Sequence, residues 1–303
     1  MGVLNLTPDS FSDGGRLRDP EAVLRQGRRM LAQGATLLDL GAQSTRPGAA
    51  MVGPEEELRR LLPALRALAP LRREHPQLLI SIDTFEAAVA EAALAEGADW
   101  INDVRGGNHT AGAPGGTLRD PAMLPLIARA GCPYVLMHSR GTSQTMDSLA
   151  VYGDVVAEVR AELLAATEAA LAAGVRREQV VWDVGLGFAK STDQNLALLR
   201  GLRGLTNPDQ TPHTDATLHT DVTLHTPSNP HNHPAQHPAP YPLLLGPSRK
   251  RFIGAVLGEP RPRARLWGTA AVCALAVAGG ARVLRVHDVG PIAQVTRMAQ
   301  ALC

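Results

Sequence analysis

The sequence has little of several features that would restrict its class. Among 303 residues there are only three cysteines, Cys132, Cys273 and Cys303, whose odd number and wide spacing argue against a disulfide framework and favour a reducing compartment. Charged residues make up 19% and the formal net charge is +1, so no excess positive charge is available to bind nucleic acid. No apolar run reaches the ~18 residues of a transmembrane helix, and the first residues fit neither a signal peptide nor a myristoylation site. These absences predict a cytoplasmic protein with no nucleic-acid or membrane partner.

Lysine is also nearly absent. Only Lys190 and Lys250 are lysines among the 30 basic residues, and the other 28 are arginine. Because a guanidinium is a flat fork and an ammonium is a compact point charge, a lysine that persists under such a bias can mark a position where arginine does not serve. We expect this of Lys250, whereas a solvated lysine retained by chance is an equally good interpretation of Lys190.

Short apolar runs alternate with longer amphipathic segments along most of the chain. The predicted strands are Val3–Leu6, Thr36–Leu40, Leu78–Ile82, Trp100–Asp103, Tyr134–His138, Val180–Asp183, Pro242–Gly246 and Arg282–Val286. The predicted helices are Pro20–Gln33, Pro54–Glu74, Phe85–Glu96, Pro121–Ala130, Val151–Ala173, Thr192–Leu202, Ala264–Ala278 and a last one from Val289. Several of these helices end at a glycine that suits a left-handed C-terminal cap, namely Gly34, Gly97, Gly131 and Gly174.

The alternation of strands and helices predicts an α/β protein with a parallel sheet. Eight such units in a chain of this length favour a single-domain (β/α)₈ TIM barrel. An open, doubly wound sheet is the alternative, but no G-x-G-x-x-G follows a predicted strand.

Polar residues gather at the carboxyl ends of the predicted strands, where barrels of this type carry their active sites. They are Asn5, Asp39, Asp83, Asn102, Asp103, His138, Asp183, the run Ser248–Lys250, Arg285 and His287. Any one of them could be a helix cap, and Asp83 followed by Thr84 would be interpreted so if it stood alone. Polar residues at the same end of all eight strands instead predict one concave site.

One segment interrupts the pattern. Residues 205–240, between the sixth helix and the seventh strand, contain seven prolines, seven threonines and six of the ten histidines. The proline density and the lack of apolar periodicity predict a disordered insertion. A His-rich tract can bind a transition metal, but no structural zinc spacing is present and a solvated loop is the preferred interpretation.

Seven motifs occur in one order along the chain. They are N-L-T-P-D-S-F-S-D-G-G at Asn5–Gly15, S-T-R-P-G at Ser44–Gly48, I-N-D at Ile101–Asp103, L-M-H at Leu136–His138, D-V-G-L-G-F-A-K at Asp183–Lys190, S-R-K at Ser248–Lys250 and R-V-H-D at Arg285–Asp288. Together they resemble the dihydropteroate synthase family. The resemblance implies that residues 1–303 form a pterin-binding (β/α)₈ barrel, usually a homodimer. It also implies a folate-pathway transferase that condenses 6-hydroxymethyl-7,8-dihydropterin pyrophosphate with 4-aminobenzoate, giving 7,8-dihydropteroate and pyrophosphate with the help of Mg²⁺.

The resemblance assigns roles to individual residues. The pterin contacts would be Asp83, Asn102, Met137, Asp183, Lys250 and Arg285. The 4-aminobenzoate contacts would be Thr45, Arg46, Pro47, Phe188 and Ser248. The pyrophosphate contacts would be Asn5, Arg285 and His287, with Asn5 also the Mg²⁺ ligand, and Asp183, Lys250, Arg285 and His287 would carry the catalysis.

These assignments agree with the chemistry of the substrates. The polar edge of a buried pterin needs matched partners, because an unpaired buried group costs about 1–3 kcal/mol. The leaving pyrophosphate gains negative charge as the C–O bond breaks, so cations and hydrogen-bond donors should surround it. Arg285 and His287 alternate with Val286, which should point the other way.

Three departures from the family pattern leave alternatives open. Gln43 stands where the family usually has Glu, and Val184 and Ala189 stand where Pro and Gly are common. One alternative is a related barrel that transfers a methyl group from a methylated pterin, although S-R-K and R-V-H-D argue against it. A second is a degenerate, non-catalytic pterin-binding protein. A Schiff-base lyase that uses Lys250 is the interpretation that the residues would suggest without the family.

Overall fold

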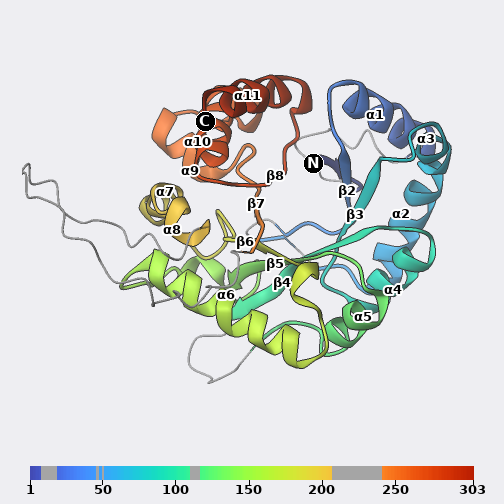
Figure 1. The fold of residues 1–303 in the computed structure, drawn as a ribbon, viewed down its shortest axis with the longest axis horizontal. Coiled ribbons are helices and arrows are strands. Elements are labelled where there is room, and N and C mark those ends of the chain that lie inside the picture. Colours follow the sequence, from blue (N-terminus) through green and yellow to red (C-terminus); the bar gives the residue numbers. More distant parts are fainter. Residues whose placement is uncertain (8–18, 46–47, 50, 110–116, 207–240) are drawn as a thin grey trace, which may run out of the picture.

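Eight parallel strands form the centre of the molecule (Figure 1). The computed structural model describes residues 1–7, 19–45, 48–49, 51–109, 117–206 and 241–303. The strands are β1 (Gly2–Asn5), β2 (Leu37–Gly41), β3 (Leu79–Asp83), β4 (Trp100–His109), β5 (Tyr134–Arg140), β6 (Val180–Asp183), β7 (Leu243–Leu245) and β8 (Val283–Leu284). They pair in chain order from β1 to β8. The predicted insertion, residues 205–240, falls almost entirely outside the described residues.

The sheet closes on itself next to its first strand. Val286, just after β8, forms a parallel bridge with Gly2. The amide of Val3 donates to the carbonyl of Val286 at 3.0 Å, and the amide of Val286 donates to the carbonyl of Met1 at 3.0 Å. Closure removes the exposed sheet edges, and the predicted single-domain barrel is confirmed.

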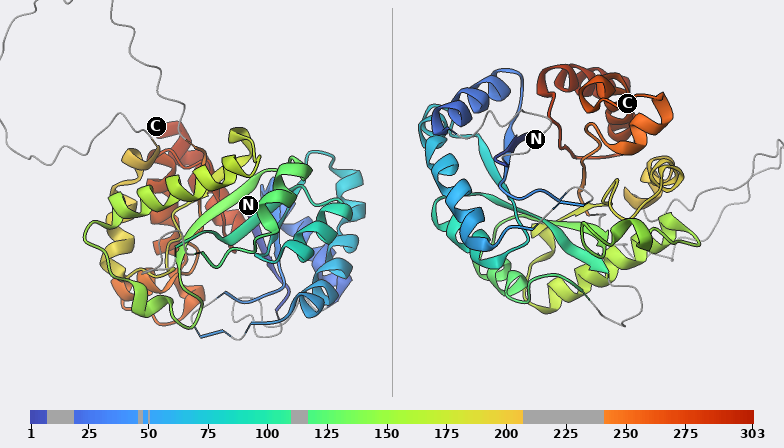
Figure 2. Two further views of the ribbon diagram at one scale, coloured as in Figure 1. Left: turned by 90° about the horizontal axis from the view of Figure 1, so that it is seen from below. Right: turned by 180° about the vertical axis from the view of Figure 1, so that it is seen from behind.

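Helices surround the strands on the outside (Figures 1 and 2). They are α1 (Pro20–Ala32), α2 (Pro54–Ala67), α3 (Ala69–Glu74), α4 (Ala87–Ala95), α5 (Met123–Ala130), α6 (Val155–Ala172), α7 (Thr192–Arg200), α8 (Leu202–Thr206), α9 (Arg251–Leu257), α10 (Leu266–Ala278) and α11 (Val289–Leu302). Three short 3₁₀ helices cover Met146–Leu149, Arg177–Gln179 and Pro262–Arg265. The four glycines predicted to end helices all have left-handed backbone conformations, with φ between 69° and 102°. No described helix is long and apolar enough to span a membrane.

Some predicted helix boundaries are wrong for identifiable reasons. The predicted helix Pro54–Glu74 is two helices, because Pro70 has no N–H to donate to the preceding turn. The predicted helix Val151–Ala173 begins only at Val155, where the Asp154 side chain accepts hydrogen bonds from two backbone amides of the first turn. The predicted helix Thr192–Leu202 ends at Arg200 and is followed by α8. Helix α9 was not predicted, because its seven residues are too few to establish a period.

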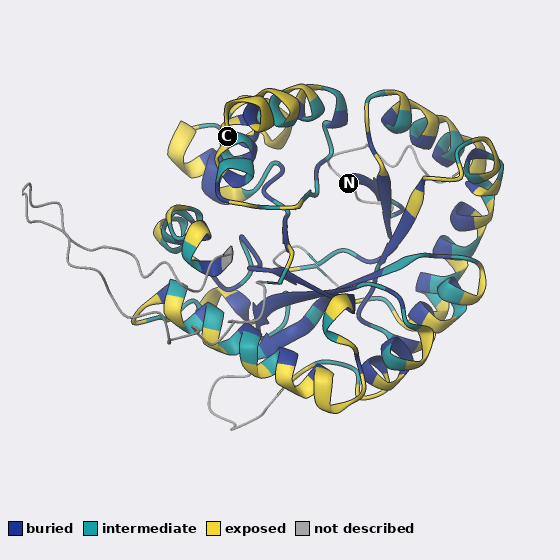
Figure 3. Ribbon diagram, in the orientation of Figure 1, coloured by how far each residue is buried: buried dark blue, intermediate teal, exposed yellow. Residues whose placement is uncertain are grey.

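The barrel interior is filled by side chains that alternate with those of the outer core. Val135, Val181 and Leu244, from β5, β6 and β7, form one buried apolar cluster. Because side chains in a strand alternate between faces, Met137 and Asp183 point the same way as Val135 and Val181, one step nearer the carboxyl end. The strands are almost entirely buried, whereas the exposed residues lie on the outer faces of the helices (Figure 3). The packed interior therefore forms the floor of the space at the carboxyl ends of the strands.

Strand β4 is longer than predicted and contains an irregularity. Its register against β5 shifts between Asp103 and Gly107. A Cβ added to Gly107 would lie 2.9 Å from the carbonyl oxygen of Met137. Glycine therefore permits the close backbone approach that lets the strand continue to His109.

Candidate active site

A pocket of about 410 Å³ opens at the carboxyl ends of the strands. It is lined by Asn5, Thr7, Gln43, Ser44, Thr45, Asp83, Asn102, Val104, Met137, Asp183, Leu186, Gly187, Phe188, Gly246, Ser248, Arg249, Lys250, Arg251, Pro262, Arg265, Arg285 and His287. A smaller hollow of about 30 Å³ shares Gln43, Ser44, Thr45, Val104 and Phe188 with it and is also lined by Phe85 and Arg105. Each of the eight strands, or the segment that directly follows it, contributes to the main pocket.

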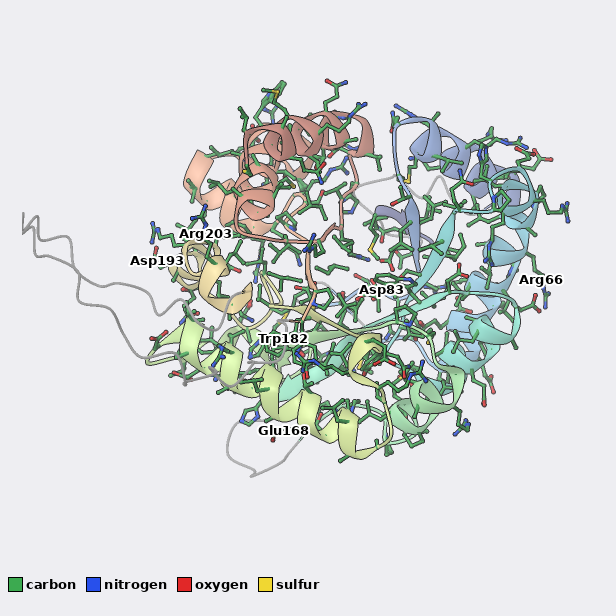
Figure 4. All side chains as sticks on the ribbon, viewed as in Figure 1. Arg66, Asp83, Glu168, Trp182, Asp193 and Arg203 are labelled. Carbon is green, nitrogen blue, oxygen red and sulfur yellow. The ribbon has the colours of Figure 1, made fainter. Side chains whose placement is uncertain are left out.

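Every residue to which the family resemblance assigns a role lines this pocket where the structure describes it. Three other strand-end residues predicted to face the same site, Asp39, Asp103 and His138, are fully buried and do not line it. Arg46 and Pro47, which are predicted to contact 4-aminobenzoate, lie outside the described residues. Figure 4 shows Asp83 near the middle of the ring of helices, whereas Arg66, Glu168 and Asp193 lie at its periphery. The predicted concave arrangement is therefore present in the fold.

Arg285 joins two carboxylates across the pocket floor. Its Nε donates to Asp39 at 2.6 Å and its Nη2 donates to Asp83 at 2.6 Å. Asp39 is fully buried and also accepts a hydrogen bond from the hydroxyl of Ser81 at 2.6 Å. Burial alone would lower the pKa of Arg285, but the two carboxylates raise it above its usual range. Arg285 is therefore a fixed positive charge.

The carboxylates of this floor are strongly desolvated. Burial raises the pKa of Asp83 to about 7, an effect that the adjacent Arg285 opposes. Asp83 binds Arg285 and does not cap the next helix. The hydroxyl of Thr84 instead accepts from the amide of Glu86 at 3.2 Å, and Asp120 accepts from the amide of Ala87 at 2.9 Å. The interpretation of Asp83 as a cap is thus excluded for its side chain.

Asp183 and Asn102 complete the acidic side of the pocket. Asp183 is buried at the end of β6 and accepts a hydrogen bond from the amide of Gly185 at 2.8 Å. Burial raises the pKa of Asp183, and the bond to Gly185 and the charge of Lys250 oppose that rise. The amide nitrogen of Asn102 lies 3.4 Å from Asp39. Helix α7 is capped by Ser191, so Asp183 is available for chemistry in the pocket.

The opposite side of the pocket carries hydrogen-bond donors. Nδ1 of His287 lies 2.9 Å from the hydroxyl of Ser248, and Nε2 lies 3.4 Å from the amide nitrogen of Asn5. Val286, between Arg285 and His287, is buried in the outer apolar core, as the alternation predicts. The residues predicted to hold pyrophosphate are thus brought together.

An aromatic wall closes the pocket on the third side. Phe85, Val104 and Met137 form a buried apolar cluster, and Phe188 packs against it. The ammonium of Lys250 lies 4.3 Å from the centroid of the Phe188 ring, which is cation–π geometry. A flat aromatic ligand would find both apolar surface and a positive charge on this wall.

Of the two interpretations of Lys190, the solvated lysine is wrong. Its side chain is buried beneath the loop that joins β6 to α7. Its Nζ lies 2.9 Å from Nδ1 of His138 and 2.9 Å from the carbonyl oxygen of Phe188. Composition bias alone could not show this, because one acceptor is the side chain of His138, 52 residues away along the chain, which only the fold brings beside the carbonyl of Phe188.

Two side chains that support the pocket, those of Asp39 and Arg265, have no role in the prediction from the sequence. Asp39 was noted only as a polar residue at a strand end, yet it orients Arg285. Arg265 donates to the backbone carbonyls of Arg249 and Lys250, at 3.0 and 3.3 Å, and so fixes the S-R-K segment from behind. The buried position of Asp39 in a strand was an available signal for it, whereas no signal in the sequence indicates Arg265.

Comparison with known proteins agrees with this geometry. Residues 1–287 match the family model described as pterin binding enzyme. The dihydropteroate synthase of Synechocystis sp. is 41% identical over 302 residues, which is 100% of this chain and 89% of that protein.

Solved structures give the same result. The Yersinia pestis dihydropteroate synthase, solved with a sulfonamide drug complex, has a TM-score of 0.81 and 33% identity, covering 100% of this chain and 93% of that one. The Xanthomonas albilineans dihydropteroate synthase has been solved with 4-aminobenzoic acid (TM-score 0.78, 37% identity, 100% and 92% coverage) and with 7,8-dihydropteroate (TM-score 0.73, 33% identity, 100% and 91% coverage). The chain therefore belongs to the pterin-binding enzyme family, among the dihydropteroate synthases.

Proposed function

We propose that this protein condenses 6-hydroxymethyl-7,8-dihydropterin pyrophosphate with 4-aminobenzoate to give 7,8-dihydropteroate and pyrophosphate. The observation that carries the proposal is one pocket at the carboxyl ends of the strands, with carboxylate and amide acceptors on one side and fixed donors on the other. Its volume of about 410 Å³ is in the range of small-molecule sites. The relatives of known structure that bind 4-aminobenzoic acid and 7,8-dihydropteroate support the same substrates here.

The pterin would lie with its polar edge toward the acidic side. Asp183 and Asn102 are positioned to pair with the aminopyrimidine N–H groups and the ring acceptors. Asp83 would contribute while Arg285 holds its Oδ2. Met137 would pack on the ring face and Lys250 would reach a ring heteroatom from the other wall. Pairing matters because each unmatched polar group at such depth costs about 1–3 kcal/mol.

The pyrophosphate would lie toward Arg285, His287 and Asn5. In the reaction the methylene C–O bond breaks and its electron pair leaves with pyrophosphate. The amine of 4-aminobenzoate then forms the new C–N bond and loses one proton. The fixed charge of Arg285 and the imidazole of His287 stabilise the negative charge that develops on the leaving group. The chemistry requires no covalent bond to the protein.

The 4-aminobenzoate would lie between the aromatic wall and the segment after β2. Phe188 would cover the ring, with Thr45 beside it and Ser248 near the carboxylate. Arg46 and Pro47 belong to the same proposed slot by family resemblance, although they lie outside the described residues. The small hollow that adjoins the main pocket is bordered by Thr45 and Phe188, as this placement requires.

Magnesium fits the pocket only as a cation carried with the substrate. Among the described residues there is no group of three or more His, Cys, Asp or Glu side chains that could hold a metal ion. Mg²⁺ often keeps several waters and binds through one or two protein ligands plus substrate phosphates. With its amide nitrogen on His287, Asn5 would offer its carbonyl oxygen to such an ion. When bound, the cation supplies charge neutralisation on the leaving group.

We also propose a cytoplasmic homodimer, in which a second copy packs on the outer face of α9, α10 and α11. Large apolar side chains are exposed there: Val256, Leu257, Trp267, Leu275, Met298 and Leu302. Trp267 is 78% exposed, which is unusual for tryptophan in a monomer. We expect Trp267→Glu to convert the dimer to a monomer in analytical ultracentrifugation. A variant that remains dimeric would exclude this face.

The test of the reaction is an assay of pyrophosphate release. We expect release that requires both the dihydropterin pyrophosphate ester and 4-aminobenzoate, with dihydropteroate formed in equal amount. Calorimetric binding of the ester without turnover would identify a non-catalytic pterin-binding protein instead.

A further inference from the structure

Lys190 stands at the centre of a buried hydrogen-bond network directly beneath the pocket. Its side chain is 7% exposed. Nζ contacts Nδ1 of His138 at 2.9 Å, the carbonyl oxygen of Phe188 at 2.9 Å and the carbonyl oxygen of Gly185 at 3.2 Å. Burial lowers the pKa of Lys190 to about 7. In its protonated form it has three N–H donors, and the three acceptors match them one for one.

The partner histidine is held in one protonation state. Burial, together with the nearby charge of Lys190, lowers the pKa of His138 to about 3, so its imidazole is neutral. Nε2 of His138 lies 2.8 Å from a carboxylate oxygen of Glu162, which only accepts. The ring proton is therefore on Nε2, and Nδ1 accepts from Lys190. Glu162 is in turn bound by the guanidinium of Arg140, so the far end of the network is anchored between α6 and β5.

The near end of the network is the loop that joins β6 to α7. Its backbone has left-handed conformations at Gly185 (φ 66°), Gly187 (φ 76°) and Ala189 (φ 47°). Ala189 carries a Cβ, so this conformation is unfavourable and must be maintained by contacts. The contacts include those of Lys190 to two loop carbonyls, the bond from the amide of Phe188 to the carbonyl of Gly185 at 3.0 Å, and that of Asn195 Oδ1, which accepts from the amide of Gly187 at 2.7 Å.

The loop carries Phe188, whose ring forms part of the pocket wall. The carbonyl of Phe188 is bound by Lys190 from below, while its ring lies 4.3 Å from the ammonium of Lys250 on the pocket side. Lys190 itself is not among the residues that line the pocket. Its contacts therefore reach a ligand through the loop, and its charge also opposes the burial that raises the pKa of Asp183 in the pocket.

We propose that Lys190 is a positioning residue that fixes the Phe188 ring and so sets the affinity for the aromatic amine substrate. The inference rests on the proposed function for the identity of that substrate. An arginine does not substitute, because a planar fork cannot direct three donors to acceptors that converge on one point.

The test compares Lys190→Met with a matched control, Thr167→Val. Thr167 is also buried and polar; its hydroxyl accepts from Nε1 of Trp182 at 2.9 Å and donates to the carbonyl of Leu163 at 2.7 Å, and neither partner belongs to residues 184–190. We expect Lys190→Met to raise KM for 4-aminobenzoate about ten-fold, an energy typical of one charged hydrogen bond. KM for the pterin ester and kcat should stay within about two-fold. Thr167→Val should lower only the melting temperature.

A double-mutant cycle with Phe188→Leu tests whether the effect acts through the ring. We expect Lys190→Met to change KM for 4-aminobenzoate little once Phe188 is replaced, because coupled residues are not additive. Additive effects, an equal rise in both KM values, or an unchanged KM in Lys190→Met would each overturn the proposal. Lys190→Arg keeps the charge and serves if Lys190→Met fails to fold. A wild-type KM in Lys190→Arg would overturn the argument for a point donor.

Hydrogen exchange separates this inference from the proposed function. We expect the amides of residues 184–190 to exchange faster in Lys190→Met than in the wild type, with no substrate present. A wild-type protein that releases no pyrophosphate would refute the proposed function, yet leave the exchange result interpretable. Unchanged exchange in this loop would refute the role of Lys190 whatever the activity.

Discussion

Lys250→Arg is the substitution that most directly tests the pocket model. The lysine stem passes close to the loop after β6, since a Cβ on Gly187 would lie 3.1 Å from Cδ of Lys250. Its ammonium lies 4.3 Å from the Phe188 ring centroid. A guanidinium is wider than an ammonium and fixed in shape, so it would displace either the ring or the edge of the pterin.

The size of the effect follows from the contacts that would be lost. A hydrogen bond from a charged donor contributes about 1.5–3 kcal/mol. The loss of one such bond to the pterin corresponds to roughly a ten- to hundred-fold fall in kcat/KM. Cation–π contact with Phe188 adds about 0.5–2 kcal/mol where it is desolvated, but an arginine could retain part of it. We therefore expect a loss near ten- to hundred-fold.

The control is the neighbouring Arg249→Lys. Nε and Nη2 of Arg249 donate to the two carboxylate oxygens of Asp288, at 3.0 and 2.7 Å. A lysine would lose this bidentate pair, which should cost about 1 kcal/mol of stability and only a few-fold in kcat/KM. Steady-state assays of pyrophosphate release compare the two variants. If Lys250→Arg keeps near-full activity while Arg249→Lys does not, the roles of the two residues are exchanged and the model of this wall is wrong.

Three further predictions concern stability, the leaving group and the insertion. Glu57 is buried, and burial raises its pKa from 4.5 to about 7, although the nearby hydroxyl of Thr84 opposes that rise. The folded state therefore binds the proton more tightly, and stability should fall as pH rises from about 4.5 through 7. Glu57→Gln should stabilise by about 1–3 kcal/mol in urea unfolding at pH 8 but little at pH 4; equal effects at both would contradict this. Arg285→Lys should weaken binding of the pyrophosphate ester more than binding of 4-aminobenzoate in calorimetry, whereas an equal loss for both would indicate misfolding around Asp39 and Asp83. Replacement of residues 207–240 by a short Gly/Ser linker should leave kcat/KM within a few-fold, because β7 is entered from the face opposite the pocket; a large loss in a folded deletion protein would place that segment in the site.

The sequence was sufficient to predict the barrel because its evidence is local. Each unit carries its own apolar run, amphipathic helix and terminal glycine, and the eight-fold repetition identifies the architecture. The errors in the predicted helices also have local causes, such as Pro70 and the cap at Asp154, which shift boundaries without changing the order of elements. The long β4 was missed because its bulge depends on the approach of β5 to Gly107, which is a tertiary contact.

The site could be predicted only as a set of residues. Parallel strands have their carboxyl ends at one face, and this rule correctly predicted that Asp83, Asp183 and Arg285 lie together. It could not indicate that Arg285 binds Asp39 and Asp83 at once, because that geometry depends on the curvature of the closed sheet. Interatomic distances are likewise needed to tell a residue that contacts a ligand from a residue that positions another side chain.

The two lysines show how a compositional bias becomes informative only with the structure. Both contact Phe188, although they are 60 residues apart: Lys250 lies over its ring and Lys190 binds its carbonyl oxygen. In one place the ammonium occupies a narrow space beside a glycine, and in the other it meets three acceptors at a single point. A guanidinium suits neither geometry, since it is broad and its donors diverge. The only two lysines among 30 basic residues thus contact the same residue, one at its ring and one at its backbone carbonyl. Lysine is therefore retained where a compact charge is required, and both of these positions lie against Phe188.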